Sequence, residues 1–414
     1  MAKSRTDNKG RVLRKGETFR KSDGSYMYKY RDPMGRLKYI YSRDILTLRE
    51  REKKLIRDQL DGLDVYVAGN ATINFVFDRY IATKTGIRDT TKSNYIYTYN
   101  QYVRDGFGNR KIADIKYSDV LAFYLSLMKE RGLTVSTVDS VHCILRPTFQ
   151  LAFRDDIIRK NPCEGAMAEV KKCTNNKTGV RHALTLEEQT AFLDYIENTE
   201  RFRGWLPLFT VMLGTGMRIG EVLGLRWEDI DLDRRRISVN HTLVYYQKDY
   251  GNYRKSVLEI SLPKTPSGIR HIPIIDSVRD AFLEMKDVSE ALGGCTSEID
   301  GYKDFIFFNR YREVQKAQPV NDAIHSICEN YNAEETIKAA RESRDPLILP
   351  YFTNHHLRHT FCSRLCEADI NLKVIQMIMG HKDIQTTMDI YAEVSEFKKH
   401  ESMIKFAEMF KNIF

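Results

Sequence analysis

The spacing of hydrophobic positions changes along the chain, and the first part reads as alternating strands followed by a helix. Between residues 17 and 41, polar and apolar positions alternate in short runs, which is typical of β-strands. Turn residues separate three predicted strands, over 17–21, 26–31 and 37–41. A helix is predicted from Leu46 to Leu60. Its apolar side is expected to hold Leu48, Leu55, Ile56 and Leu60.

The second part, residues 72–163, follows helical spacing throughout and predicts a helical bundle. Its four apolar stripes run over 73–81, 95–102, 120–128 and 138–152. Ser118 is a candidate cap for the third helix. Pro147 predicts a kink or a new segment in the fourth helix, because proline removes a backbone donor. Asn161 and Pro162 are expected to end the bundle.

The third part, residues 184–414, mixes both periods and follows a polar, lysine-rich linker at 164–183. Thr185 and Glu188 have the spacing of a capping box, which predicts a helix start. A hairpin is predicted from 257–262 and 270–275 around turn residues 264–268. The expected fold is mixed and mainly α. It combines a β-sheet and helix domain (1–66), a helical bundle (72–163) and an α+β domain (184–414).

Charge is concentrated at the N-terminal end. The net charge is +9, yet residues 1–60 alone hold 18 basic and 8 acidic side chains. Such an excess favours a polyanionic partner. A small sheet can enter a DNA major groove, and the side chains predicted to contact DNA are Lys21, Lys29, Arg36 and Lys38. The alternative is a solvated charged face without a partner.

Cysteine usage and hydropathy indicate where the chain works. The seven scattered cysteines favour a reducing compartment. No apolar run of eighteen residues and no secretory signal is seen, so a cytoplasmic protein without a membrane partner is expected.

Cys362 and Cys366 near His359 could suggest metal ligands. Two small core residues on one helix face are the favoured interpretation, and no metal or cofactor is expected.

Several reactive side chains gather in the third part. Four of the ten histidines fall between residues 355 and 381. Thr353 is a candidate helix cap, after which His355, Arg358 and His359 share one face. The candidate catalytic residues are Arg218, Lys264, His355, Arg358, His381 and Tyr391.

The chemistry of this set points to a phosphodiester. It lacks the clustered carboxylates that Mg²⁺ needs and the loop that binds nucleotide phosphates. Two guanidinium groups suit the non-bridging oxygens of a phosphodiester, because each can bind bidentately. A tyrosine hydroxyl is a possible nucleophile. With a free pKa of about 10, it needs a nearby cation or a basic histidine.

In their order and motifs these residues resemble the tyrosine recombinase family, in layout the integrases of conjugative transposons. The quoted motifs are Arg218, Lys264, His355-His356-Leu357-Arg358, Gly380-His381 and Tyr391. The resemblance implies that Arg218 and Arg358 bind the scissile phosphate and that Tyr391 forms a 3′-phosphotyrosyl bond. It implies Lys264 as general acid, His355 as general base, and His381 as a phosphate or nucleophile contact. Glu221 is a candidate to orient Arg218, and His356 and His359 are expected to be structural.

The resemblance also implies partners. The N-terminal domain would bind arm sites on double-stranded DNA, and the bundle would bind core sites. A tetramer on paired sites would exchange C-terminal tails, and an excision helper protein is a further candidate partner. The tail has apolar residues at helical spacing, namely Met403, Phe406, Ala407, Phe410 and Phe414.

Two other functions compete with site-specific recombination. A type IB topoisomerase-like enzyme would use the same chemistry on one duplex, but the basic N-terminal domain and apolar tail favour a recombinase. A regulator could keep the fold without catalysis, but the complete set of reactive residues counts against it.

Overall fold

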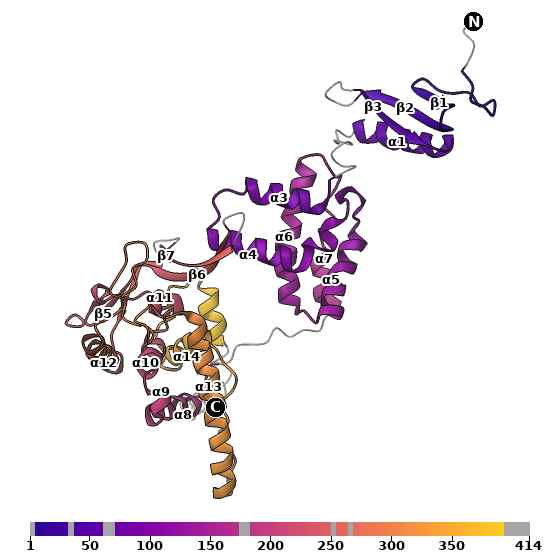
Figure 1. The fold of residues 1–414 in the computed structure, drawn as a ribbon. Coiled ribbons are helices and arrows are strands. Elements are labelled where there is room, and N and C mark those ends of the chain that lie inside the picture. The colour runs from indigo at the N-terminus through magenta and orange to yellow at the C-terminus, as the bar shows by residue number, and fades with distance from the viewer. Residues whose placement is uncertain are drawn as a thin grey trace, which may run out of the picture. The chain divides into compact units, whose positions relative to one another are not determined.

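The structure is a computed structural model that describes residues 5–31, 37–60, 71–173, 183–249, 254–263 and 268–392. It divides into two compact units, Met1–Thr178 and Gly179–Phe414 (Figure 1). The first unit has separate hydrophobic cores for its N-terminal module and its helical bundle. Nowhere in these ranges is a helix both long and apolar enough to span a lipid bilayer.

The N-terminal module is a three-stranded antiparallel sheet with one helix across it (Figure 1). Its elements are β1 (Glu17–Arg20), β2 (Ser25–Arg31), β3 (Leu37–Ser42) and α1 (Ile45–Leu60). The predicted strands and helix are thus present. Tyr26 on β2 packs with Ile45 and Leu48 on α1 to form the core.

One prediction for α1 is wrong. Ile56 is 42% exposed rather than part of the apolar side. The buried positions are Ile45, Leu48, Glu52 and Leu55. These lie three or four residues apart, whereas Ile56 follows Leu55 directly and lies about 100° further around the helix. Leu60 is also predicted on the apolar side, but its side chain is not among those that the structure describes.

The bundle contains five α-helices among the described residues. They are α3 (Ile73–Thr83), α4 (Asp89–Tyr99), α5 (Tyr117–Arg131), α6 (Val135–Arg154) and α7 (Ala166–Cys173). A π-helix, η1 (Asn100–Arg104), continues α4, and two 3₁₀ turns follow at Phe107–Asn109 and Ile112–Asp114. The apolar positions predicted for the first helix are all buried, with Tyr80 and Ile81 at its C-terminal end.

Three local predictions for the bundle are corrected. Pro147 lies inside α6, which remains one helix of 20 residues, so of the two outcomes predicted there the start of a new segment is wrong. Ser118 is not the cap of α5: the helix begins after Lys116, whose backbone N donates to Asp119 at 2.9 Å. The predicted linker is wrong over α7, whose residues Ala166, Met167 and Val170 are buried in the bundle core. Lys171 and Lys172 directly follow these apolar residues, so the segment looked like a polar linker in the sequence.

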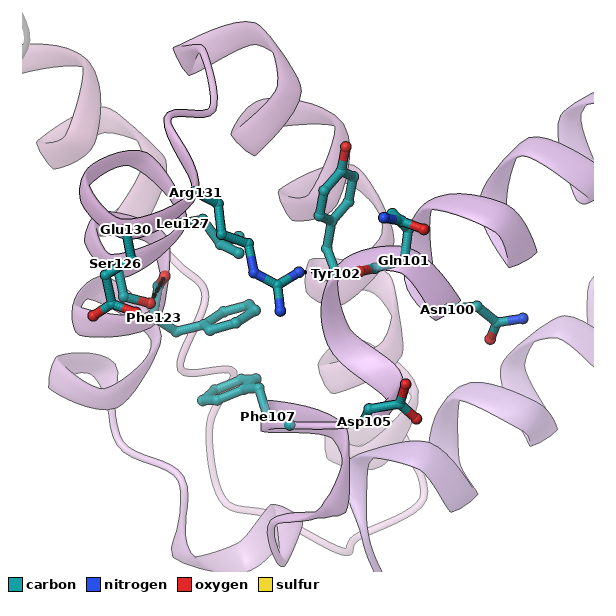
Figure 2. Close-up of a pocket in the computed structure, with 11 residues that line it drawn as sticks. Asn100, Gln101, Tyr102, Asp105, Phe107, Phe123, Ser126, Leu127, Glu130 and Arg131 are labelled. Atoms are coloured by element: carbon teal, nitrogen blue, oxygen red, sulfur yellow. Dashed lines mark hydrogen bonds between the residues drawn. The ribbon is translucent and has the colours of Figure 1, made fainter.

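A pocket of about 240 Å³ opens beside η1 (Figure 2). Phe107 and Phe123 line it and stack on each other with ring centroids 4.3 Å apart. Arg131 donates from Nη1 to the carbonyl of Gln101 at 3.1 Å. Among the described residues, none that is predicted to be catalytic or to contact DNA lines this pocket.

The second unit combines helices with two small antiparallel sheets. Its helices are α8 (Leu186–Asn198), α9 (Glu200–Arg203), α10 (Leu206–Thr215), α11 (Ile219–Leu223), α12 (Asp276–Leu292), α13 (Ala317–Glu342), α14 (Asn354–Glu367) and α15 (Leu372–Met379). Its strands are β4 (Ile230–Asp231), β5 (Arg236–Val239), β6 (Thr242–Asp249), β7 (Arg254–Ser261) and β8 (Arg270–Pro273). The capping box at Thr185 is confirmed, since Thr185 and Glu188 exchange backbone–side-chain hydrogen bonds.

The predicted hairpin between residues 257–262 and 270–275 is wrong, although both strands exist. β7 pairs with β6, and β8 pairs with β5 in a different sheet of order β4-β5-β8. Alternation identifies a strand but does not choose its partner. Here β6 lies nearer in sequence on the other side of β7 and matches it over eight residue pairs.

Two cores hold the second unit together. The larger one surrounds α10, with Phe192, Phe209, Phe282 and Phe305 fully buried. A smaller one joins α14 and α15 through Cys362, Cys366, Ile375 and Met379, and Ile390 completes it. Cys362 and Cys366 are therefore small core residues on one helix face, as favoured from the sequence. The described residues contain no group of three or more His, Cys, Asp or Glu arranged to hold a metal ion.

Candidate active site

Arg218 is placed by a tight turn between α10 and α11. Gly216 ends α10 with φ +60°, in the left-handed region. A Cβ there would also lie 2.3 Å from the Phe361 ring and 3.0 Å from the Met379 sulfur, so only glycine fits. Arg218 is then the N-cap of α11, and its backbone N donates to Glu221 Oε2 at 2.9 Å. Its Nη1 donates to Glu221 Oε1 at 3.0 Å, and the side chain is 45% exposed.

Arg358 comes from the second turn of α14. Thr353 is the N-cap of this helix, and its backbone N donates to His356 Nδ1 at 3.1 Å, so His356 supports the helix start. Arg358 is buried, and it donates from Nη1 to the Gly216 carbonyl and from Nη2 to the Met379 carbonyl, both at 2.6 Å. Burial and then the nearby Arg218 charge lower the pKa of Arg358 to about 9. It therefore stays charged at neutral pH.

The end of α15 brings the two arginines together. Gly380 caps this helix with φ +63°. Its carbonyl accepts from Arg218 Nη2 at 3.4 Å, directly after the Met379 carbonyl that binds Arg358. Adjacent peptide groups thus hold both guanidinium groups, and the positive charge is fixed in one place before any ligand binds.

His381 directly follows Gly380 in the chain and is half-buried. Its Nδ1 shares a hydrogen bond with Thr387 Oγ1 at 2.9 Å. Burial, followed by the charges of Arg358, Arg218 and other nearby cations, lowers the pKa of His381 to about 4. The imidazole is therefore neutral at pH 7. His355, which is also among the groups that act on His381, is exposed on the first turn of α14.

Tyr391 lies on the helical segment 385–392 that also carries Thr387. Its neighbour Ile390 is buried in the smaller core against α14 and α15. The Tyr391 side chain itself is 38% exposed. The hydrogen bond between His381 and Thr387 therefore ties the tyrosine-bearing segment to the arginine cluster. Lys264 lies outside the described residues.

Sequence reasoning missed one buried charge in this cluster, Arg270. Both it and Glu221 are buried, and Arg270 Nη2 donates to Glu221 Oε2 at 2.7 Å. Burial by itself raises the pKa of Glu221, but hydrogen bonds to Arg270 and Arg218 outweigh it and hold the pKa below its usual value. The signal was present in β8, where Arg270 shares the core-facing side with Ile272. A charge at a core position needs a buried partner.

The basic face of the N-terminal module differs from the prediction at one residue. Lys29 is exposed and pairs with Tyr39, whereas Lys38 pairs with Tyr30. Because side chains alternate across a strand, Lys38 lies on the opposite face of the sheet. Lys21 is exposed in the turn after β1, and Arg36 lies outside the described residues.

The face that carries Lys29 has aromatic neighbours that the sequence reasoning did not single out. Tyr39 and Tyr41 are each 45% exposed there. The Arg20 guanidinium lies 5.5 Å from the centre of the Tyr41 ring. Basic and aromatic groups are therefore interleaved on this face, while α1 covers the other.

Comparison with known proteins agrees with this arrangement. Residues 182–397, just over half of the chain, match the model of the phage integrase family. The chain belongs to the phage integrase family. Residues 1–59 match a second family, the DNA binding domain of tn916 integrase. The family resemblance read from the sequence is thus confirmed.

Curated relatives extend the similarity over nearly the whole chain. The transposase from transposon Tn1545 of Streptococcus agalactiae is 31% identical over 408 residues, which cover 95% of each chain. The transposase from transposon Tn916 of Enterococcus faecalis gives the same identity and coverage. A solved structure of the Tn1549 transposon integrase, in complex with transposon right end DNA, is 29% identical with a TM-score of 0.68. The match covers 81% of this chain and 100% of that one.

This phage integrase family member is a tyrosine recombinase, an enzyme that cleaves and rejoins DNA at specific sites. The expected fold class is also confirmed, with a helical majority and small antiparallel sheets.

Proposed function

We propose that the chain integrates and excises a mobile DNA element through a covalent Tyr391–DNA intermediate. The observation that carries the proposal is the pair of arginines held by the adjacent carbonyls of residues 379 and 380. This pair forms a fixed site for one phosphate beside the tyrosine-bearing segment. Relatives named as transposases and a transposon-bound integrase support a mobile element as the substrate.

Arg218 and Arg358 would bind the non-bridging oxygens of the scissile phosphate. Each guanidinium keeps further N–H donors beyond those that hold it in place. Their orientation is set before DNA binds, so little reorganisation is needed as charge develops on phosphorus. Tyr391 Oη attacks the phosphorus, a phosphotyrosyl ester forms to the 3′ end, and the 5′ oxygen leaves. The ester keeps the bond energy, so a second strand's 5′-hydroxyl can rejoin the DNA by the reverse step.

Two proton transfers complete the step. Lys264 would give a proton to the leaving 5′ oxygen. His355, exposed at the first turn of α14, would accept the proton of Tyr391. His381 is neutral and engages Thr387 through Nδ1, so its second ring nitrogen is available for the phosphate or the tyrosine oxygen.

The remaining parts would supply DNA binding and assembly. The N-terminal module would bind arm sites through the face with Lys29 and Tyr41, and the bundle would bind core sites of double-stranded DNA. Four protomers on paired sites would exchange their C-terminal tails, and the tail residues 403–414 lie outside the described residues. The proposed place of action is the bacterial cytoplasm, with an excision helper as a candidate partner.

Trapping on nicked DNA tests the proposal. A set of overlapping duplexes would cover the DNA on both sides of the gene, and each duplex would hold one nick. Cleavage next to the nick releases a short strand, so the DNA cannot be rejoined and the enzyme stays attached. A covalent adduct is expected at a flank, and two such sites on one plasmid should recombine. Relaxation of a one-site plasmid without recombination would favour the topoisomerase-like alternative. Binding without any adduct would favour the non-catalytic regulator.

A further inference from the structure

Three arginines converge on the last carbonyls of α15. The Ile378 carbonyl accepts from Arg270 Nε at 2.7 Å, next to the carbonyls that bind Arg358 and Arg218. The final carbonyls of a helix have no partner within the helix and carry partial negative charge. Three consecutive peptide groups therefore serve as a common base for three cations, of which only two belong to the proposed phosphate site.

Glu221 connects the third arginine to the first. Its Oε1 accepts from Arg218 Nη1 at 3.0 Å and from Arg270 Nη1 at 3.2 Å. Its Oε2 accepts from the Arg218 backbone N at 2.9 Å and from Arg270 Nη2 at 2.7 Å. One carboxylate is thus shared by two guanidinium groups, and the cluster of three side chains keeps one net positive charge.

The shared carboxylate lets Glu221 orient Arg218 without cancelling the charge of Arg218. A carboxylate that orients Arg218 by itself would also cancel its charge and weaken its attraction for a phosphate. When Arg270 balances Glu221 from the buried side, the orienting hydrogen bond remains and the charge of Arg218 stays available. Arg270 also fixes the peptide chain next to the Arg358 acceptor. A Cβ at Gly380 would lie 3.0 Å from Arg270 Nη1, so this end of α15 packs directly on the Arg270 side chain.

We infer that Arg270 is a positioning residue for DNA cleavage, which balances Glu221 and holds the end of α15 so that Arg218 and Arg358 meet one phosphate. The inference rests on the proposed function. A role in stability alone accounts poorly for this residue, because buried ion pairs are often replaceable by apolar residues without loss of stability. Each of these three side-chain hydrogen bonds leads to a group that contacts a phosphate-binding arginine or adjoins its acceptor.

The test uses the full-length chain and the nicked duplexes that trap the wild-type enzyme. Single-turnover experiments give two separate quantities, the rate constant of adduct formation and its final amplitude. The variants are Arg270→Lys, Arg270→Met, and Arg270→Met combined with Glu221→Gln. Arg234→Met is the matched control, because the Arg234 side chain is 77% exposed and its ion pair with Asp231 is 3.8 Å long. DNA affinity is measured for each variant by titration.

A positioning role predicts a lower rate constant at a preserved amplitude. Arg270→Met should slow cleavage about 10- to 100-fold, by analogy with the loss seen when a residue that orients a metal ligand is replaced. Arg270→Lys should cleave faster than Arg270→Met, because lysine keeps the positive charge. It should stay slower than the wild type, because it lacks the planar guanidinium that donates to both oxygens of Glu221. The double variant should be faster than Arg270→Met, because no unbalanced carboxylate remains beside Arg218. DNA affinity should change less than about threefold, and Arg234→Met should match the wild type.

Other outcomes overturn the inference. A merely structural role would lower the amplitude, through loss of folded enzyme, and leave the rate constant of the remaining fraction unchanged. If Arg270→Met does not fold, Arg270→Lys decides: a wild-type rate constant in that variant contradicts a positioning role. Failure of the proposed function is distinguishable, because the wild-type enzyme itself would then form no adduct.

Discussion

The arginine cluster at the end of α15 and the basic face of the N-terminal module use positive charge in opposite ways. In the cluster, Arg358 is buried and bound to two backbone carbonyls. On the N-terminal face, Arg20 and Lys29 are exposed, and Arg20 lies over an exposed tyrosine ring. Fixed cations suit a reaction whose rate depends on geometry. Exposed cations suit affinity for a polyanion, to which each adds a small, salt-dependent share.

The N-terminal module also contains buried charges, and they serve its fold. Glu17 is fully buried and pairs with Arg49 at 2.8 Å, and Asp7 pairs with Arg11 at the same distance. The first pair joins the sheet to α1. The second lies within the loop before β1, and Asp7 also accepts from the Tyr26 hydroxyl of β2 at 2.8 Å. Basic residues in this module therefore fall into two groups, and total charge alone does not show which of them are free to meet DNA.

The largest expected effect comes from the nucleophile. Tyr391→Phe removes the attacking oxygen, so adduct formation should fall by at least about 10⁴-fold. DNA affinity should stay within about threefold, because the ring remains. The measurement is single-turnover trapping on the nicked duplex. Tyr311→Phe is the control, since Tyr311 is 66% exposed and lies in the same unit. An adduct in the Tyr391 variant at the wild-type rate would refute the assignment.

Arg358→Lys should slow cleavage by about 10²- to 10³-fold, as when one preorganised donor to the transition state is removed. A lysine ammonium lacks the planar fork that spans the carbonyls of Gly216 and Met379. DNA affinity should fall less than the rate constant, because many other contacts bind the duplex. Parallel titrations and trapping separate the two. Equal losses in both would mean that Arg358 contributes to binding rather than to the reaction.

A smaller effect compares the two faces of the N-terminal sheet. Lys29→Ala should weaken arm-site binding several-fold and lower the salt slope of the affinity by about one. Lys38→Ala should do less, because Lys38 lies on the face toward α1. Filter binding at several salt concentrations measures both. Equal effects of the two substitutions would contradict the assignment of the DNA-binding face.

The smallest expected effect concerns pH. The pKa of His381 is about 4 in the folded chain, below its usual 6.5, chiefly because of burial. Between these values the unfolded chain binds the extra proton, so the free energy of unfolding falls as pH drops from about 6.5 toward 4. Thermal unfolding across this window should show a smaller fall for His381→Asn than for the wild type. An identical pH dependence in both would show that His381 ionises as freely in the folded chain as in the unfolded one.

Sequence patterns predicted the elements of this fold better than their partners. Periodicity located the strands of the N-terminal module and the helices of the bundle, because burial imposes the spacing directly. It did not show that β7 pairs with β6, since pairing depends on contacts between distant segments. It also missed α7, whose three buried residues are too few to stand out beside two lysines.

The same limit applies to the candidate site. Motif order placed Arg218, Arg358, His381 and Tyr391 in one family pattern, and the structure brings the arginines and His381 together. Arg270 carries no motif of its own. Its role depends on a carboxylate 49 positions away and on the end of α15, and only the folded chain brings these together.

The most direct test of the account is to identify the residue that becomes attached to DNA. Wild-type enzyme trapped on the nicked duplex would be digested with nuclease and protease, and the nucleotide-bearing peptide sequenced by mass spectrometry. The account predicts a 3′-linked nucleotide on the oxygen of Tyr391. A nucleotide on any other side chain would contradict it.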